Sequence, residues 1–186
     1  MKIIKTSIDG VLIIKPKVHF DDRGHFFENY NKHDFKSHGI PFKFIQDNHV
    51  FSKIRVLRGL HFQLKYPQGK LVRVTEGSIY DVAVDIRIGS PTYGNHVGLE
   101  LTSENKKMLF IPESFAHGYQ VISDTAEVQY KCTQLYNPDD DFGITWNDPE
   151  VNINWPLENP FLSDKDNKLP ELRNIPHDLL PVYGEN

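Results

Sequence analysis

The stretch GSIYDVAVDIRIGSP, residues 77–91, decides the fold class of this chain. Apolar Tyr80, Val82, Val84, Ile86 and Ile88 alternate there with Asp81, Ala83, Asp85 and Arg87. Successive side chains of a strand point to opposite faces, so this period of two predicts a strand. The strand should begin after the turn at Glu76-Gly77 and end at Gly89-Ser90-Pro91.

Short strands of this kind recur along the whole sequence. A second alternation places Ala126, Val128, Tyr130 and Cys132 on one face, so Tyr130 should point inward with the apolar residues. Further strands are predicted over residues 11–14, 42–46, 54–58, 70–74, 97–101 and 107–111. This count of short strands separated by turns is typical of an all-β sandwich or small barrel.

Helix is scarce, and the tail after Pro156 is rich in proline. A short helix is predicted over 32–38, with Asn31 as its N-cap and Gly39 as its C-terminal stop. The tail should form irregular structure that lies over the domain. No linker or repeat divides the 186 residues, so we expect one domain spanning 1–186.

Composition excludes several classes of protein. The formal net charge of −4 argues against a phosphate-binding surface for nucleic acid. No apolar run approaches the length of a membrane span, and the N-terminus lacks the apolar core of a signal peptide. Cys132 is the only cysteine, so no internal disulfide can form and the cytoplasm is the expected location.

Nine histidines raise the question of a metal site. Neither Cys-x-x-Cys nor His-Glu-x-x-His nor His-x-His occurs, and these spacings are the usual ones for metal ligands on helices and strands. We therefore expect no metal and interpret most of the histidines as surface or hydrogen-bonding residues.

His61 and His117 differ from the others because both stand near glycine in apolar sequence, in LRGLHFQ (57–63) and IPESFAHGYQ (111–120). A neutral, buried imidazole can act as a general base near neutral pH, although either side chain could equally be a core histidine bound to a carbonyl. In a regular strand Arg58 and His61 would face opposite ways. A bulge at Gly59 would bring both side chains into one cavity, and we predict one.

Basic side chains offer a second kind of chemistry. Lys70, Arg58 and Arg23 could converge on a diphosphate, whereas we interpret Arg73 as a solvated surface charge. Phosphate binding must rely on such side chains, because neither Gly-x-x-x-x-Gly-Lys-Ser/Thr nor Gly-x-Gly-x-x-Gly occurs.

Ten stretches resemble the dTDP-4-dehydrorhamnose 3,5-epimerase family over nearly the whole chain. They are DDRGHFFE, IQDNHV, LRGLHFQ, PQGKLVRV, GSIYDVAVDIR, SPTYG, ENKKMLFIPESFAHGY, VQYKCTQLY, GITWNDPEVNINWP and LSDKD. The resemblance implies a cupin-type jelly roll that is usually a homodimer. It implies inversion of C3 and C5 of a nucleotide-linked 4-keto sugar without a cofactor, so the expected ligand is dTDP-4-dehydro-6-deoxy-D-glucose.

The resemblance also implies roles for individual residues. The catalytic base falls on His61, its carboxylate partner on Asp166 and the general acid on Tyr130. Lys70 is our candidate for the charge that faces the ketone oxygen, with His117 as an alternative donor or a support for the base. The implied substrate contacts are Arg23, Phe26, Glu28, Gln46, Asn48, Arg58, Lys70, His117, Asp141 and Lys165.

Two positions depart from the family's pattern, and three functions other than the 3,5-epimerase are alternatives. Asp141 stands where a glutamate is usual, and His96 where an aromatic residue is more familiar. Relatives that invert one carbon share these motifs, so a single 3- or 5-epimerase is the main alternative. A non-catalytic cupin that binds sugar nucleotides and a metal-dependent cupin dioxygenase are the others.

Overall fold

The computed structural model describes residues 1–38, 40 and 43–184. The opening stretch forms β8 (Ser78–Asp85) near the edge of an antiparallel sheet of five strands. Its other strands are β6 (Leu57–Gln63), β9 (His96–Thr102), β11 (Phe115–Val121) and β13 (Asp141–Gly143), in the order β13-β6-β11-β8-β9. We call it the five-stranded sheet.

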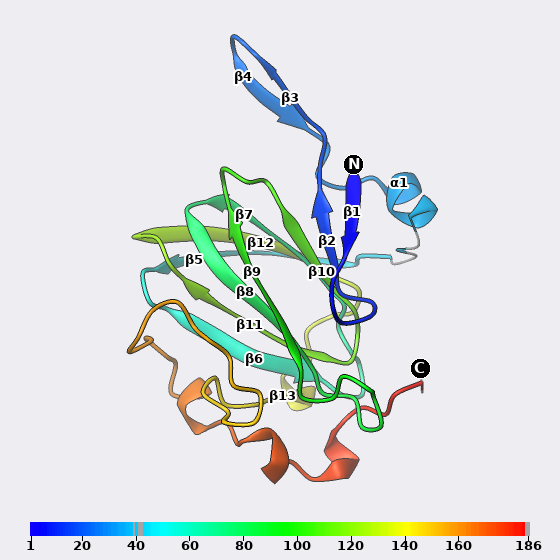
Figure 1. Ribbon diagram of the computed structural model, residues 1–186, viewed down its shortest axis with the longest axis vertical. Coiled ribbons are helices and arrows are strands. Elements are labelled where there is room, and N and C mark those ends of the chain that lie inside the picture. The colour runs from blue at the N-terminus through cyan, green and yellow to red at the C-terminus, as the bar shows by residue number, and fades with distance from the viewer. Residues whose placement is uncertain (39, 41–42, 185–186) are drawn as a thin grey trace.

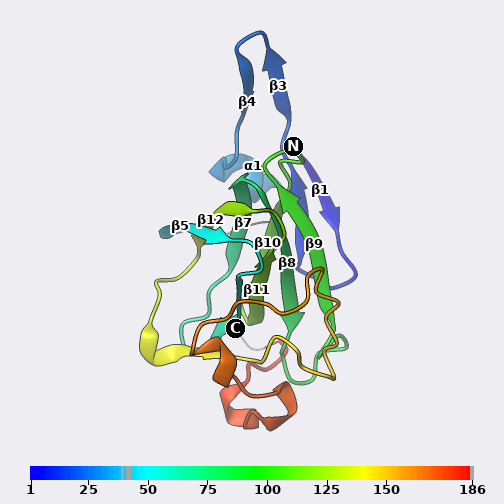
Figure 2. The ribbon, with the colours of Figure 1, turned by 90° about the vertical axis from the view of Figure 1, so that its left-hand side faces the viewer.

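A six-stranded sheet faces it (Figures 1 and 2). Its strands are β1 (Lys2–Lys5), β2 (Leu12–Lys15), β5 (Gln46–Lys53), β7 (Lys70–Glu76), β10 (Met108–Ile111) and β12 (Thr125–Cys132), in the order β1-β2-β10-β7-β12-β5. All pairings within both sheets are antiparallel. Two facing sheets of this kind make the cupin-type jelly roll, as predicted.

Three apolar clusters hold the layers together. The interior cluster, which includes Val72, Leu109, Phe115 and Val128, fills the space between the sheets. The second covers the outer side of the five-stranded sheet, where the tail contributes Leu172, Ile175 and Leu180. The third, around Phe35 and Met108, packs the helix on the outer side of the other sheet.

The face of β8 that carries Asp81 and Asp85 is buried, and both side chains are 0% exposed. The alternation therefore does not separate a core face from a solvent face. Ala83 of the same face belongs to the interior cluster, whereas Val82 and Val84 pack under the tail. Both faces of the strand are covered, which explains why an acidic residue on it needs a partner.

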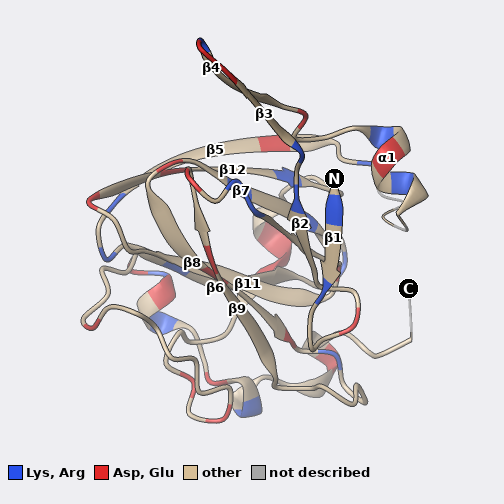
Figure 3. Cartoon of the chain, turned by 45° about the horizontal axis from the view of Figure 1, so that its top comes forward, with Lys and Arg blue, Asp and Glu red and all other residues tan. Residues whose placement is uncertain are grey.

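A separate two-stranded hairpin, β3 (Val18–Asp21) paired with β4 (Gly24–Phe27), projects from the body of the molecule (Figures 1 and 2). Its side chains are largely exposed, and Phe20 and Phe26 are 76% and 73% exposed. Charged residues gather at its tip (Figure 3).

The helix α1 (Lys32–Ser37) lies where the sequence predicts one. The side chain of its N-cap, Asn31, accepts hydrogen bonds from the backbone amides of His33 and Asp34. Gly39, the predicted stop, lies outside the described residues. No helix in the described part of the chain is long and apolar enough to span a bilayer.

The tail is irregular, as predicted, and its described part contains three short 3-10 turns after residue 156: η2 (Asp166–Lys168), η3 (Leu172–Asn174) and η4 (His177–Leu179). A further turn, η1 (Pro138–Asp140), precedes β13. Figure 1 shows the tail running below β6 and β13. Asp148 helps to fix it, because its buried carboxylate accepts from the backbone amides of Val151 and Leu172.

Two predicted strands were placed wrongly. The strand predicted over 42–46 is β5, which begins only at Gln46; residue 42 lies outside the described residues. The strand predicted over 54–58 begins at Leu57, because Ile54 and Arg55 belong to a turn in which Arg55 has a φ of 66°. The turn carries neither glycine nor proline, so no local signal predicts it.

Candidate active site

A bulge in β6 shapes one wall of the site. Opposite β11, Arg58 pairs with Tyr119 and His61 with His117, so three steps on β6 match two on β11. Gly59 adopts a φ of +107°, and a Cβ there would lie 2.6 Å from the carbonyl oxygen of His117. The extra residue brings Arg58 and His61 to the same cavity, which confirms the prediction made from LRGLHFQ.

The cavity has a volume of about 420 Å³ and opens between the two sheets. Eight of the predicted site residues line it, namely Arg58, His61, Lys70, His117, Tyr130, Asp141, Lys165 and Asp166. A second hollow of about 320 Å³ shares several of these residues and adds Gln46 and Asn48. The structure therefore brings together most of the predicted set.

His61 forms a close pair with Asp166 at the start of η2. Its Nε2 lies 2.6 Å from Asp166 Oδ1, and Asp166 is only 3% exposed. Burial raises the pKa of Asp166, but hydrogen bonds from His61 and Ser163 outweigh it, so the pKa lies below its ordinary value. An ionised Asp166 holds the ring proton on Nε2 and leaves the Nδ1 lone pair free to accept a proton.

His117 and Asp81 form a second pair beside the first, which no local pattern in the sequence predicts. His117 Nε2 lies 2.7 Å from Asp81 Oδ1, and both side chains are buried. Burial lowers the pKa of His117. A neutral His117 with its proton directed to Asp81 presents an acceptor at Nδ1, which makes it less suited than Lys70 to donate to an oxyanion.

Lys70 and Tyr130 reach the cavity from the six-stranded sheet. The ammonium group of Lys70 makes no hydrogen bond or ion pair with the described residues, and burial lowers its pKa. Burial also raises the pKa of Tyr130, so its phenol stays protonated at neutral pH. Tyr130 points inward against the interior cluster, as its alternation predicts.

At the mouth of the cavity Asp141 has two partners within the chain. It forms an ion pair with Lys165 and accepts a hydrogen bond of 2.9 Å from the hydroxyl of Tyr136. This arrangement joins β13 to the segment that carries Asp166. Sequence reasoning missed Tyr136, which also lines the cavity.

Gln46 and Asn48 form an amide pair at the neighbouring hollow. Gln46 Nε2 donates to Asn48 Oδ1 over 3.0 Å, and Gln46 Oε1 accepts from the backbone amide of Tyr136 over 2.8 Å. Asn48 lies directly across from Tyr130 in the β5–β12 register. The pair offers fixed donors and acceptors beside the proposed acid.

Three predicted substrate contacts lie away from the cavity of their own chain. Arg23, Phe26 and Glu28 belong to the projecting hairpin or to the residue after it, and none lines either hollow. The Arg23 side chain is 90% exposed and pairs with Asp21 at 2.6 Å. These three residues therefore do not join the cavity of their own chain, and their contact with the substrate stays a prediction.

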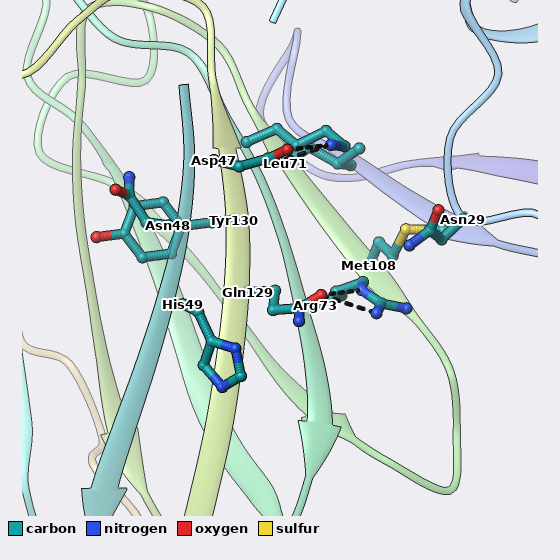
Figure 4. Close-up of a pocket in the computed structure, with 10 residues that line it drawn as sticks. Asn29, Asp47, Asn48, His49, Leu71, Arg73, Met108, Gln129 and Tyr130 are labelled. Atoms are coloured by element: carbon teal, nitrogen blue, oxygen red, sulfur yellow. Dashed lines mark hydrogen bonds and ion pairs between the residues drawn. The ribbon is translucent and has the colours of Figure 1, made fainter. Parts of the chain in front are cut away.

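Two residues noted in the sequence lie outside the cavity. His96 Nδ1 is 3.1 Å from the carbonyl oxygen of Val151, so this departure from the family's pattern does not touch the site. Arg73 is not a solvated charge, because its guanidinium donates to Gln129 Oε1 over 2.8 Å. It lines a third hollow of about 220 Å³ over β5, β7 and β12 (Figure 4).

Among the described residues, no three His, Cys, Asp or Glu side chains are grouped so as to hold a metal ion. The histidines of the cavity have carboxylate partners instead.

Known proteins resemble the chain in sequence and in structure. The profile of the dTDP-4-dehydrorhamnose 3,5-epimerase family matches residues 5–174. The dTDP-4-dehydrorhamnose 3,5-epimerase of Methanothermobacter thermautotrophicus is 51% identical over 178 residues, which are 94% of this chain and 96% of the relative.

Solved structures of nucleotide-sugar epimerases also resemble the chain. A dTDP-6-deoxy-D-glucose-3,5-epimerase from Legionella pneumophila, in complex with dTDP-4-keto-L-rhamnose, superposes with a TM-score of 0.96 at 47% identity and covers 99% of both chains. A 3'-monoepimerase from Streptomyces bikiniensis, in complex with dTDP-quinovose, superposes with a TM-score of 0.91 at 31% identity, covering 96% of this chain and 92% of its own.

Proposed function

The chain belongs to the dTDP-4-dehydrorhamnose 3,5-epimerase family, and from this premise we propose how its cavity carries out the reaction. The enzyme is an isomerase that inverts C3 and C5 of dTDP-4-dehydro-6-deoxy-D-glucose to give dTDP-4-dehydro-L-rhamnose. One observation carries the assignment of residues: a histidine–carboxylate pair and a protonated tyrosine enter one cavity from opposite sheets.

His61 acts as the base. The carbon atoms beside the C4 ketone carry acidified protons, and the Nδ1 lone pair takes one of them. The C–H electrons form a double bond to C4, and the carbonyl electrons move onto the ketone oxygen. Asp166 fixes the ring and stabilises the imidazolium that results, as the orienting acid does in other catalytic pairs.

Lys70 stabilises the enolate oxygen, and Tyr130 completes the inversion. A cavity that lifts the ammonium out of water strengthens its attraction to the oxyanion. The Tyr130 phenol then donates its proton to the carbon from the face opposite His61, because the two groups come from facing sheets. After each inversion the His61 imidazolium gives its proton to water and the Tyr130 phenolate takes one from water, so both groups return to their starting states. One such cycle at C3 and one at C5 give the L-sugar, and no electrons are gained or lost.

The remaining groups of the cavity bind the substrate. Arg58, whose Nε donates to Ser52, lies at an exposed position where its outer nitrogens can bind the diphosphate in a bidentate manner. Gln46 and Asn48 are placed for the nucleotide base. We assign Asp141 and Lys165 to the cavity mouth, where exchange of their ion pair for a contact with the ligand would close the site.

We further propose a homodimer in which each hairpin serves the partner's cavity. Large exposed aromatic side chains on a projecting element mark an interaction surface, and Phe20 and Phe26 fit this description. β5 is an edge strand of eight residues that carries Gln46 and Asn48, and its outward-facing Phe51 is 55% exposed. In such a dimer Arg23, Phe26 and Glu28 would contact the substrate bound in the partner's cavity. This would explain why they lie away from the cavity of their own chain.

Incubation with dTDP-4-dehydro-6-deoxy-D-glucose in deuterium oxide tests the reaction. We expect deuterium at both C3 and C5 of the product, because each inversion exchanges one carbon-bound proton with solvent. Label at neither carbon would refute the assignment of the reaction.

A single-centre epimerase is the second candidate function, because the chain also resembles a 3'-monoepimerase in structure. It predicts stable label at one carbon only, with the other carbon still bearing its original proton after prolonged incubation. The cytoplasmic location and the single domain over 1–186 stay predictions.

A further inference from the structure

The hydroxyl of Tyr119 is a buried polar group that the proposed mechanism does not use. Tyr119 is 3% exposed and lines the catalytic cavity from β11. Its oxygen makes no hydrogen bond of ordinary geometry with the described residues. A buried hydroxyl without a partner is unfavourable, so a residue kept in this state on a cavity wall points to a partner that enters with the ligand.

The surroundings of Tyr119 place this hydroxyl among the groups that face the sugar. Its ring lies 6.3 Å from that of His117, centroid to centroid, on the same inward face of β11. Across the strand pair it stands opposite Arg58. Arg58 and Tyr130 line the same cavity as Tyr119, so the three side chains face one space.

Ser52 is the nearest hydroxyl, and it does not remove the need for a partner. Ser52 Oγ already accepts a hydrogen bond from Arg58 Nε over 3.1 Å. If Ser52 donates its own proton to the phenol oxygen, the phenol proton still lacks an acceptor. Burial raises the pKa of Tyr119 to about 12, so at neutral pH the group is a donor.

We propose that Tyr119 is a further substrate-binding residue, whose hydroxyl donates a hydrogen bond to an oxygen of the hexose ring beside Arg58. The contact is to the sugar rather than to the diphosphate, because Tyr119 lies deep in the cavity while Arg58 occupies an exposed position. The inference rests on the proposed function, since it takes a nucleotide-linked hexose as the ligand.

The test compares Tyr119→Phe with Tyr80→Phe. Tyr80 lies on the neighbouring strand but packs against Trp155 on the outer side of the sheet, so its variant loses a hydroxyl away from the cavity. Binding is measured by calorimetry with dTDP and with dTDP-glucose, which lacks the ketone and therefore does not react. Melting temperatures of the free proteins and kcat/KM for the 4-keto sugar complete the set.

We expect Tyr119→Phe to weaken dTDP-glucose binding about 3- to 10-fold and to leave dTDP binding within about 2-fold, the range of one neutral hydrogen bond. kcat/KM should fall by the same factor as the sugar affinity, and the melting temperature of the free protein should not fall. Tyr80→Phe should bind both probes as the wild type does.

Three outcomes would overturn the inference. Equal weakening of both probes would place the contact on the nucleotide or diphosphate. A lower melting temperature with unchanged binding would show that the hydroxyl has a structural partner, and no change in either would show that it has no role. These results bear on Tyr119 only if the wild-type protein converts the 4-keto sugar. If the wild-type protein does not convert it, the proposed function itself is wrong.

Discussion

The two histidines of the cavity show how a neighbouring carboxylate sets the chemistry of a side chain. Both hold Nε2 against an aspartate, at 2.6 Å for His61 and 2.7 Å for His117. They differ in surroundings, because the side chain of His61 is 30% exposed whereas that of His117 is 7% exposed. The more exposed ring has room for a substrate against Nδ1, which favours it as the base.

Replacement of the base tests this assignment. His61→Asn should lower kcat about 10²- to 10⁴-fold, because asparagine cannot accept the carbon-bound proton. The affinity for dTDP, measured by calorimetry, should stay near the wild-type value. His33→Asn, on the exposed side of α1, is the matched control. Full turnover by the His61 variant would rule out the mechanism.

The acid is tested by separating deprotonation from inversion. Tyr130→Phe keeps the ring but removes the donor, so an enolate formed by His61 should return to substrate more often than it proceeds. In deuterium oxide, nuclear magnetic resonance should therefore show label entering recovered substrate faster than product appears. Parallel loss of both rates would indicate that Tyr130 does not act after the first proton transfer, and Tyr80→Phe controls for loss of a hydroxyl.

The ionisation of Lys70 should set how kcat changes at high pH. Its ammonium form stabilises the enolate, and burial lowers its pKa, so kcat should fall as pH rises through a value below the ordinary 10.5 of lysine. The pKa of Tyr130 is raised, so its ionisation belongs to a higher range. Lys70→Arg, which stays charged, should shift the alkaline limb of the kcat profile upward; an unshifted limb would assign it to another group.

At the scale of elements, one glycine in β6 decides whether the site exists. The bulge at Gly59 turns a strand that would separate Arg58 from His61 into one that presents both to the cavity. Glycine is required for two reasons, the positive φ and the contact of 2.6 Å that a Cβ would make with the backbone of β11.

Gly59→Ala should therefore destabilise the protein beyond the cost of a positive φ. We expect a loss of about 2–5 kcal/mol in the free energy of unfolding, combining backbone strain with overpacking. Gly89→Ala is the matched control, because Gly89 has a φ of +81° and open space around it, and it should cost about 1–2 kcal/mol. If urea titrations give the same loss of unfolding free energy for both variants, the close approach to β11 does not contribute to the cost.

The sequence predicted elements well where local signals exist. Alternation located β8 and β12, and Asn31 located the start of α1. The turn at Ile54 and Arg55 was missed because no glycine or proline marks it, and the pairing of Asp81 with His117 was missed because it joins two strands. Local patterns show which residues form a strand, whereas the partner of a buried charge depends on sheet order, which one sequence does not show.

At the scale of the whole molecule, the two sheets and the tail divide the work of the site. The five-stranded sheet carries His61 and His117, the six-stranded sheet carries Lys70 and Tyr130, and the tail brings Asp166. None of the hairpin residues lines the catalytic cavity of its own chain. The dimer proposed above rests on the hairpin's exposed aromatic residues and on its projection from the body of the molecule (Figures 1 and 2).

Complementation between two inactive variants tests this exchange. A chain with His61→Asn keeps its hairpin but lacks the base, and a chain with Arg23→Ala and Phe26→Ala keeps the base but lacks the hairpin contacts. If each hairpin serves the partner, one of the two sites in a mixed dimer has all its parts. Equal co-expression should then restore about a quarter of wild-type activity, since half of the dimers are mixed and each has one working site.

The contrary geometry gives a different result in the same experiment. If the hairpin served its own chain, every site in the mixed dimer would lack either the base or the hairpin, and dimers purified through two different tags would be inactive. If the Arg23 and Phe26 variant is fully active by itself, the hairpin does not contribute to the site. Recovery of activity in the tagged mixed dimer therefore distinguishes a site built from two chains from a site complete in one.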